Sequence, residues 1–487
     1  MYDMAKNQGD NKVTIMEKLF GYLIGPFGAM LASGIFASIL QSYFTDVLKI
    51  SLTFLTTLQL VSMFLIVASN LVAGQLIERT KALAGKARPW ILVSALTVSV
   101  TTVLMFIIPF ENQTAKMVWI AIAYNLYYAV AYPIYSTANS TLLSLSTRDT
   151  GERSSLAALI NVSGLAVMGA GSMIFPMLVS FALKENQSLW FITFLAIGIF
   201  SGLTILLQYR FTRERVTEEL REKASETATE DGMAGEMPTS EVNDDRKVNE
   251  NVPLKTQLKA LFTEKTFWII IVFYMGFQWG GALKNGTMTY FCKWVLDNSI
   301  MGSADAWGVS QSILSIAGAV PMALAALFVV PLSNKIGKKN LCAIGMVIGV
   351  IGGVIAGLGA DNLYIAATGV AIKCLGSAPA CYLILAMLAD EIDFIEKKTG
   401  VRSDGLTMSI YGAILSAGSG IMNALFSALL NIFGYDQYAD VADGVLAQTA
   451  SVHGVITFGY IWFETICFAL CAVLILFWNV EKKAAER

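Results

Sequence analysis

Twelve apolar runs of about 20 residues dominate this sequence and limit what it can fold into. A run of that length crosses the hydrocarbon core of a bilayer as a helix, and it is too long and too uniformly apolar to be a barrel strand. Only 14% of the residues are charged, whereas a soluble globular protein carries about 25%. The sequence therefore predicts an all-α membrane protein with twelve transmembrane helices. The predicted spans are 19–44, 52–77, 90–110, 117–142, 155–182, 188–208, 267–292, 308–332, 340–359, 363–389, 405–433 and 455–479.

One polar segment, 210–265, divides the twelve runs into six and six. It contains RERVTEELREKASETATEDGMAGEMPTSEVNDDRK, which is highly charged and poor in aromatic residues. A segment of this composition cannot bury enough apolar surface to form a core, so it is expected to be a linker. The sequence thus predicts an N-terminal six-helix half over 1–209, a cytoplasmic linker over 210–265 and a C-terminal six-helix half over 266–487.

The basic residues favour one side of this layout. If the N-terminus lies inside, the outer connections hold only Lys49, Lys116, Lys184 and Lys293. Lysine and arginine concentrate in cytoplasmic connections, so both termini are predicted to be cytoplasmic in a multi-pass protein of the cell (inner) membrane. The apolar runs make the lipid bilayer a partner, and the net charge of −2 argues against nucleic acid as another.

Two basic turns occupy equivalent places in the two halves. The turn between the second and third runs reads ERTKALAGKARPW at 78–90, and the turn between the eighth and ninth reads PLSNKIGKKN at 331–340. Matching turns in a six-plus-six layout are typical of the parallel repeats of major facilitator transporters. The alternative is that the preference for basic residues on the cytoplasmic side explains each turn by itself.

Several motifs give the chain a family resemblance. The stretch ERTKALAGKARPWIL resembles the T-x-S-x-W-G-x-x-R-P-W signature of the glycoside–pentoside–hexuronide:cation symporters, the family of the melibiose permease. Further motifs follow in the right order: YFTDV at 43–47, the P-x-Y-S element within YPIYSTANSTL, TYFCKWVLDN at 289–298 and MLADEIDFIEKKTGVRSDG at 387–405. The resemblance spans nearly the whole chain. It implies the major facilitator fold and transport of a sugar, glycoside or sugar acid by alternating access.

The chain departs from this family where the family carries acidic residues. The two acids of the second helix fall on Ile66 and Asn70, and the sugar-contacting acid of the first helix falls on Met30. The acid of the fourth helix falls on Ala131, and the lysine of the eleventh falls on Ser416. A carboxylate lets a site hold Na⁺ or exchange H⁺. Na⁺ coupling is therefore not expected, and H⁺, another ion or uniport stays open. Met30, Asn70 and Ser416 remain in the predicted substrate site by position.

Three charged residues lie inside predicted spans. Lys373 is ten residues into the tenth span, about 15 Å deep at 1.5 Å per residue. Lys284 lies on the seventh span, nearer the outer face, and Glu464 lies on the twelfth span at about the depth of Lys373. Because such groups are costly in a membrane, they are functional candidates. The major facilitator layout puts the seventh and tenth helices at the central cavity, so Lys373 and Lys284 are predicted to bind substrate, preferentially an acidic one. The alternative for Lys373 is a structural pair with Glu464.

Aromatic and amide side chains extend the predicted substrate site. Tyr124, Tyr128 and Tyr132 recur every four residues of the fourth run, and Gln278 and Trp279 lie on the seventh. Aromatic faces and amides are common sugar ligands. Packing between helices or against lipid is the alternative for each of them.

A cytoplasmic gate is predicted from charges near the helix ends. Asp390 and Asp393 end the tenth run, and Arg79, Arg88 and Arg153 lie in basic cytoplasmic segments. Pairs between these groups would close the inner side during alternating access. The alternative is ordinary solvated charge at helix ends.

Two function classes fit these observations. The first is a secondary transporter of a small polar solute, and the second is a solute sensor with a transporter fold that does not transport. No nucleophile–base pair, metal motif or phosphate loop stands out, so neither an enzyme nor a cofactor or metal is expected.

Overall fold

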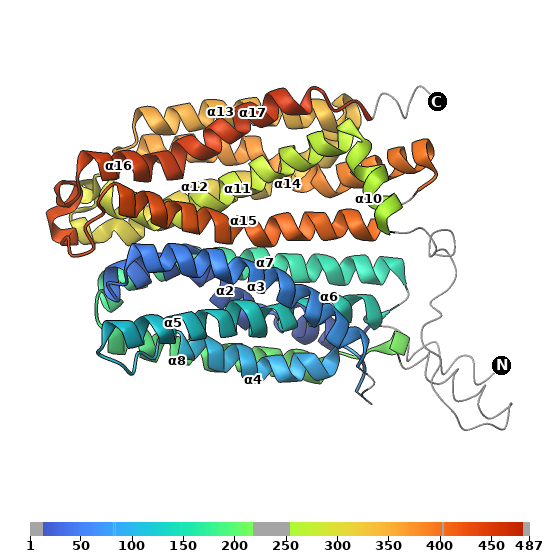
Figure 1. The fold of residues 1–487 in the computed structure, drawn as a ribbon, viewed down its shortest axis with the longest axis horizontal. Coiled ribbons are helices and arrows are strands. Elements are labelled where there is room, and N and C mark those ends of the chain that lie inside the picture. The colour runs from blue at the N-terminus through green and yellow to red at the C-terminus, as the bar shows by residue number, and fades with distance from the viewer. Residues whose placement is uncertain are drawn as a thin grey trace. The chain divides into compact units, whose positions relative to one another are not determined.

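The computed structural model describes residues 13–80, 82, 84–147, 149–217, 254–401 and 404–480. In these ranges all regular elements are helices, and the β-pairing is limited to one isolated bridge between Ala82 and Gly85. Each predicted apolar run corresponds to one helical segment (Figure 1). The prediction of an all-α fold is therefore confirmed.

Six helical segments come from the N-terminal half, and three of them include a wider π-helical turn. In chain order they are η1–α2–η2 (Glu17–Val47), α3 (Leu52–Glu78), α4 (Arg88–Leu104), α5–η3–α6 (Gln113–Ser146), α7 (Thr150–Leu178) with η4 (Val179–Leu183), and α8 (Gln187–Phe211).

Six more segments follow the predicted linker, most of which lies outside the described residues. They begin after the short helix α10 (Leu254–Thr263) and are α11 (Lys265–Trp294), α12 (Trp307–Ile336), α13 (Lys338–Leu358), α14 (Leu363–Thr399), α15 (Asp404–Ile432), and α16 (Ala450–Thr457) joined through η8 (Phe458–Trp462) to α17 (Phe463–Ile475). The short helices η5 (Asn298–Met301), η6 (Ala304–Ala306) and η7 (Val441–Ala447) lie in connections.

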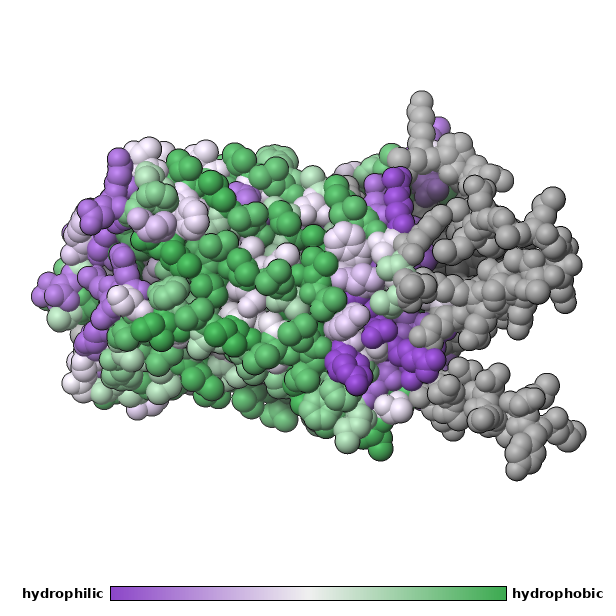
Figure 2. All heavy atoms as spheres, turned by 90° about the horizontal axis from the view of Figure 1, so that it is seen from below, coloured by the Kyte–Doolittle hydropathy of each residue, from purple (hydrophilic) through white to green (hydrophobic). Residues whose placement is uncertain are grey.

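Length and hydropathy agree with membrane crossing for most of these segments. Among the described residues, ten are long and apolar enough to span a bilayer, while α4 and the apolar part of the α7–η4 segment (Gly169–Leu183) are shorter. Apolar side chains cover the middle of the helices and hydrophilic ones gather toward their ends (Figure 2). Leu96, Leu203 and Phe328 are each more than half exposed, as is typical of helix faces that meet lipid.

The chain forms two compact units that do not coincide with its sequence halves. The first unit takes in the described residues of Met1–Phe36, Phe64–Gly171 and Asn186–Asn243. The second takes in those of Ala37–Met63, Ser172–Glu185 and Asp244–Arg487. The ends of three N-terminal segments therefore group with the C-terminal helices. The boundaries predicted at 209 and 266 remain a prediction about sequence repeats.

In the second unit, small residues bring α13 and α14 into close contact. A Cβ added at Gly376 would lie 2.4 Å from the backbone nitrogen of Gly349, and one at Gly352 would lie 2.4 Å from the backbone nitrogen of Lys373. Glycine at these positions lets two membrane helices approach backbone to backbone. This packing fixes the part of α14 that carries Lys373.

The helix α14 is ten residues longer than its predicted apolar run. It continues to Thr399 and carries the buried acid Glu391. Both carboxylate oxygens of Glu391 accept hydrogen bonds in the second unit, Oε1 from the Thr266 hydroxyl at 2.6 Å and Oε2 from the Trp478 indole at 2.7 Å. Gly400, at φ +69°, then ends the helix in the left-handed conformation that glycine favours.

In the first unit, the basic turn at 78–90 is organised around a carboxylate. Glu214, just after α8, accepts hydrogen bonds from the backbone N–H groups of Lys86, Ala87 and Arg88, each at 2.8 Å. Gly85 has φ +115°, and an added Cβ would lie 2.3 Å from the Glu214 carboxyl carbon. The glycine of the signature thus allows the turn to enclose an anion at the N-terminus of α4.

Candidate functional site

Three charged side chains form an ionic cluster inside the second unit. Lys284 of α11, Lys373 of α14 and Glu464 of α17 meet there, and their side chains are 17%, 1% and 5% exposed. Lys373 Nζ lies 2.6 Å from Glu464 Oε2, and Lys284 Nζ lies 3.5 Å from Glu464 Oε1. Two lysines therefore share one carboxylate, and at their formal charges the cluster has one surplus positive charge.

Lys373 is neutralised by direct contact with Glu464. The Lys373 ammonium also donates to the backbone carbonyl of Tyr460 at 3.3 Å, and it lies 5.8 Å from the centre of the Tyr460 aromatic ring. The pairing that the sequence left as an alternative is thus present. Substrate binding by Lys373 stays a prediction.

Lys284 holds the surplus charge of the cluster. Its contact with Glu464 is the longer of the two, and its ammonium lies 3.9 Å from the Cys374 sulfur. A carboxylate shared between two lysines cannot neutralise both. Because Lys284 is the more exposed and the more loosely paired lysine, it is better placed than Lys373 to meet a ligand.

Two further predicted residues precede Lys284 on α11. Gln278 and Trp279 are half-buried. The Trp279 indole donates to the Ile414 carbonyl at 3.3 Å, and its ring lies against Gly418 of α15, where an added Cβ would be 2.6 Å away. Trp279 therefore packs between helices, which was the alternative to sugar binding for this residue. Its role as a sugar ligand stays a prediction.

The predicted tyrosines form an aromatic cluster in the first unit. The Tyr124 and Tyr128 ring centres are 4.6 Å apart, and Tyr127, which the sequence analysis did not select, lies 5.0 Å from Tyr128 and 5.9 Å from Tyr132. Phe36 packs edge-on against Tyr127 at 4.8 Å. The π-helical turn η3 (Tyr127–Ala131) brings the additional tyrosine into the cluster; such turns are frequent at functional sites.

The positions inherited from the family's acids have ordinary helix contacts. Met30 lies 3.2 Å from the Cβ position of Gly164. The Asn70 amide donates to the Ile66 carbonyl one turn earlier at 2.9 Å. Both sites are half-buried. The side chain of Ser416 lies outside the described part of the structure.

The three arginines of the predicted gate differ in their surroundings: one has partners in the first unit, one is exposed, and the side chain of the third lies outside the described residues. The Arg88 guanidinium donates to the Tyr209 carbonyl at 3.1 Å and stacks on the Tyr209 ring at 4.9 Å. Arg79 is exposed. The side chain of Arg153 is outside the described residues.

The acids of the predicted gate lie in the second unit. Lys338 contacts Asp390 at 2.5 Å, which joins the second basic turn to α14, and Asp393 is exposed. The gate stays a prediction, because these observations show only the contacts of each group within its own unit.

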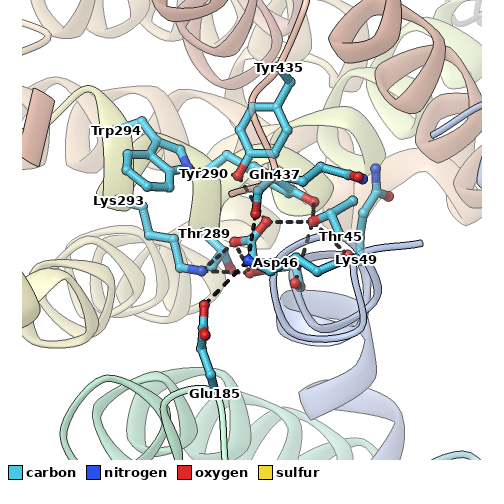
Figure 3. Close-up of polar contacts among 12 residues, drawn as sticks. Thr45, Asp46, Lys49, Glu185, Thr289, Tyr290, Lys293, Trp294, Tyr435 and Gln437 are labelled. Atoms are coloured by element: carbon cyan, nitrogen blue, oxygen red, sulfur yellow. Dashed lines mark hydrogen bonds and ion pairs between the residues drawn. The ribbon is translucent and has the colours of Figure 1, made fainter. Parts of the chain in front are cut away.

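Sequence reasoning missed a second buried ion pair. Asp46 of η2 (Tyr43–Val47) and Lys293 of α11 lie 2.5 Å apart in the second unit, and they are 8% and 7% exposed (Figure 3). Both belong to motifs that carried the family resemblance, and Lys293 was predicted to lie in an outer connection. A charge just beyond the end of an apolar run was the available signal.

Comparisons with known proteins agree with the fold and motifs. The family described as MFS/sugar transport protein matches residues 21–240 and 233–482. The isoprimeverose transporter of Lactiplantibacillus pentosus is 28% identical over 474 residues, covering 95% of this chain and 88% of that protein. The glucuronide carrier protein homolog of Escherichia coli (strain K12) is 21% identical over 458 residues, covering 91% of each.

Solved structures show the same architecture at low sequence identity. The nucleoside transporter NupG superposes with a TM-score of 0.59 at 15% identity, covering 93% of this chain and 98% of that one. A bacterial homologue of the human lysosomal transporter Spinster gives 0.61 at 12% identity, covering 95% of each. These likenesses establish the fold. With the family match over nearly its whole length, the chain belongs to the sugar transporters of the major facilitator superfamily, among the glycoside–pentoside–hexuronide:cation symporters.

Proposed function

We propose that this protein moves an acidic sugar, such as a hexuronide, across the cytoplasmic membrane by alternating access. The ionic cluster Lys284–Glu464–Lys373 is the observation that carries the proposal. Its surplus positive charge would be neutralised by one ligand carboxylate, which offsets the cost of holding a charge in the membrane. A neutral disaccharide would leave that charge unpaired.

The division of roles within the cluster follows from its distances. Glu464 holds Lys373 tightly at 2.6 Å and Lys284 loosely at 3.5 Å. A ligand carboxylate would therefore take Lys284 as its partner while the tighter pair stays intact. Lys373 acts in this proposal by neutralising Glu464, so that Glu464 does not repel the ligand.

The proposal includes transport without Na⁺ coupling. The family's second-helix acids are replaced by Ile66 and Asn70, and the Asn70 amide is bound to the carbonyl of Ile66. Neither side chain supplies a carboxylate, the group that would both attract and coordinate Na⁺ inside the membrane. Relatives are named as a transporter of isoprimeverose and as a glucuronide carrier homolog, which supports a saccharide as cargo and leaves its charge to be tested.

Flux through reconstituted protein tests this function directly. Purified protein in liposomes should exchange a radiolabelled methyl glucuronide across the bilayer, with equal rates in Na⁺ and K⁺ media. Binding of the sugar without flux would indicate a sensor and contradict the proposal. A steep dependence of flux on Na⁺ would show that the coupling inference from Ile66 and Asn70 is wrong.

A further inference from the structure

We propose that Asp46 and Lys293 form an outer latch, an ion pair that must separate each time the carrier opens outward. This inference rests on the proposed function because it requires alternating access, and it also requires the predicted orientation. All the contacts that define it lie within the second unit, where they hold Ala37–Met63 against C-terminal helices (Figure 3).

The pair is surrounded by hydroxyl groups. Lys293 Nζ donates to Asp46 Oδ2 at 2.5 Å and to Ser42 Oγ at 3.0 Å. Asp46 Oδ1 accepts from the Thr45 hydroxyl at 2.7 Å and from the Tyr435 hydroxyl at 2.9 Å. Tyr290 also contacts the Thr45 hydroxyl, at 2.6 Å. Both carboxylate oxygens are thus satisfied by groups that water can replace.

The latch joins segments that are far apart in the sequence. Asp46 is 247 residues from Lys293 and 389 from Tyr435. One turn before Lys293, Thr289 donates to the Ser38 carbonyl at 2.6 Å. Polar contacts therefore repeat along the seam between α2–η2 and α11.

A second polar layer lies next to this seam. The side-chain amide of Gln41 donates through Nε2 to the Ser427 hydroxyl at 2.9 Å. That hydroxyl donates to the side-chain oxygen Oε1 of Gln59 at 3.2 Å, and Gln59 Nε2 donates back to Gln41 Oε1 at 3.3 Å. These three buried side chains close a ring of hydrogen bonds between α2, α3 and α15.

The chemistry of the seam favours a separable contact over a permanent one. A buried ion pair adds little to stability compared with apolar packing of the same volume, because desolvation offsets the attraction. The same desolvation is recovered when the two groups part and are hydrated. An apolar seam would lose its contacts and gain unfavourable hydration on opening. A seam of charges, amides and hydroxyls therefore lowers the cost of outward opening while excluding water in the closed state.

A buried position behind the latch provides the test. Thr289 is fully buried one turn from Lys293. In a variant whose six native cysteines are replaced by alanine, Thr289→Cys is labelled from outside by a membrane-impermeant maleimide. Asp46→Asn should raise the labelling rate about 10-fold, because the charged hydrogen bonds are weakened. Tyr435→Phe keeps the ion pair but removes the donor to Asp46 and the acceptor of the Trp294 indole, and it should raise the labelling rate about 3-fold.

An exposed ion pair supplies the matched control. Lys184 and Asp305 also join an N-terminal segment to C-terminal residues, at 2.7 Å, but their side chains are 55% and 39% exposed. Asp305→Asn should change the labelling rate by less than about 2-fold, since exposed pairs contribute little.

The outcomes separate the latch from the proposed cargo, because labelling needs no sugar. Wild-type labelling rates in folded Tyr435→Phe protein would overturn the latch, even if Asp46→Asn fails to reach the membrane. Equal acceleration by Asp305→Asn would also overturn it. Accelerated labelling in a protein that carries no sugar would uphold the latch and contradict the proposed function.

Discussion

At the scale of single residues, the two lysines of the ionic cluster differ in what they do for the protein. Lys373 is 1% exposed and tightly paired with Glu464, whereas Lys284 is 17% exposed and more loosely paired. Depth in the predicted helices made both lysines ligand candidates and raised a Lys373–Glu464 pair as the alternative. The sequence could not show that Lys284 shares the same carboxylate at a longer distance, because the three residues lie on three different helices.

Removing Lys373 should therefore damage the fold more than removing Lys284. Lys373→Met leaves the buried Glu464 with its looser partner alone, and breaking a buried pair costs about 3–5 kcal/mol. Lys284→Met keeps the 2.6 Å pair and should cost less than about half of that. Melting temperatures of the two variants in detergent give the comparison; a larger drop for Lys284→Met would contradict the assigned roles.

The first basic turn should depend on the Glu214 carboxylate for its stability. Glu214→Ala leaves the three N–H groups of residues 86–88 without their acceptor, so thermal stability should fall by about 1–3 kcal/mol. Glu214→Gln keeps one carbonyl oxygen and should fall between the wild type and Glu214→Ala. Equal stability of all three proteins would show that the turn does not depend on this anion.

At the scale of elements, close helix packing was harder to anticipate than the helices themselves. The apolar runs predicted every membrane helix because the signal is local in sequence. Which glycines face a neighbouring helix is set by packing partners, and the many glycines of α13 and α14 look alike in the sequence. The π-helical turns η2 and η3, which carry Asp46 and Tyr128, were likewise not predicted, because they depend on how the neighbouring helices pack.

Two glycine substitutions separate packing from helix propensity. Gly376→Ala would place a Cβ 2.4 Å from the backbone of Gly349 and should destabilise the protein by about 1–3 kcal/mol. Gly74→Ala in α3 meets nothing within 4 Å and should be neutral or stabilise by up to about 1 kcal/mol. Thermal unfolding of both variants measures the contrast, and similar effects of the two would refute the close contact of α13 with α14.

At the scale of the whole molecule, the sequence predicted the architecture better than the connections within it. The twelve helices and the family follow from local runs and motifs. The grouping of Ala37–Met63 with the C-terminal helices depends on contacts such as Asp46–Lys293, which span 247 residues. Pairing over that distance cannot be deduced from one sequence, so the second ion pair became visible only in the structure.

The orientation of the chain in the membrane can be tested by labelling from outside the cell. With the linker inside, Ser225→Cys should resist an impermeant maleimide added to intact cells and react after the membrane is opened. Tyr438→Cys, at a residue that is 77% exposed in a connection predicted to lie outside, should react without opening. The reverse pattern would place the termini outside.

The charge of the cargo can be measured by comparing two sugars that differ in one group. Methyl glucuronide and methyl glucoside differ by a carboxylate, so their affinities for the wild type and Lys284→Met isolate the effect of charge. Lys284→Met should weaken glucuronide binding about 10- to 100-fold, which corresponds to the loss of one charge-assisted contact. Glucoside binding should change little, and Lys116→Met, in a connection predicted to lie outside, should alter neither. Equal loss of both sugars, or no loss of glucuronide binding in a folded Lys284→Met protein, would contradict an acidic cargo held by Lys284.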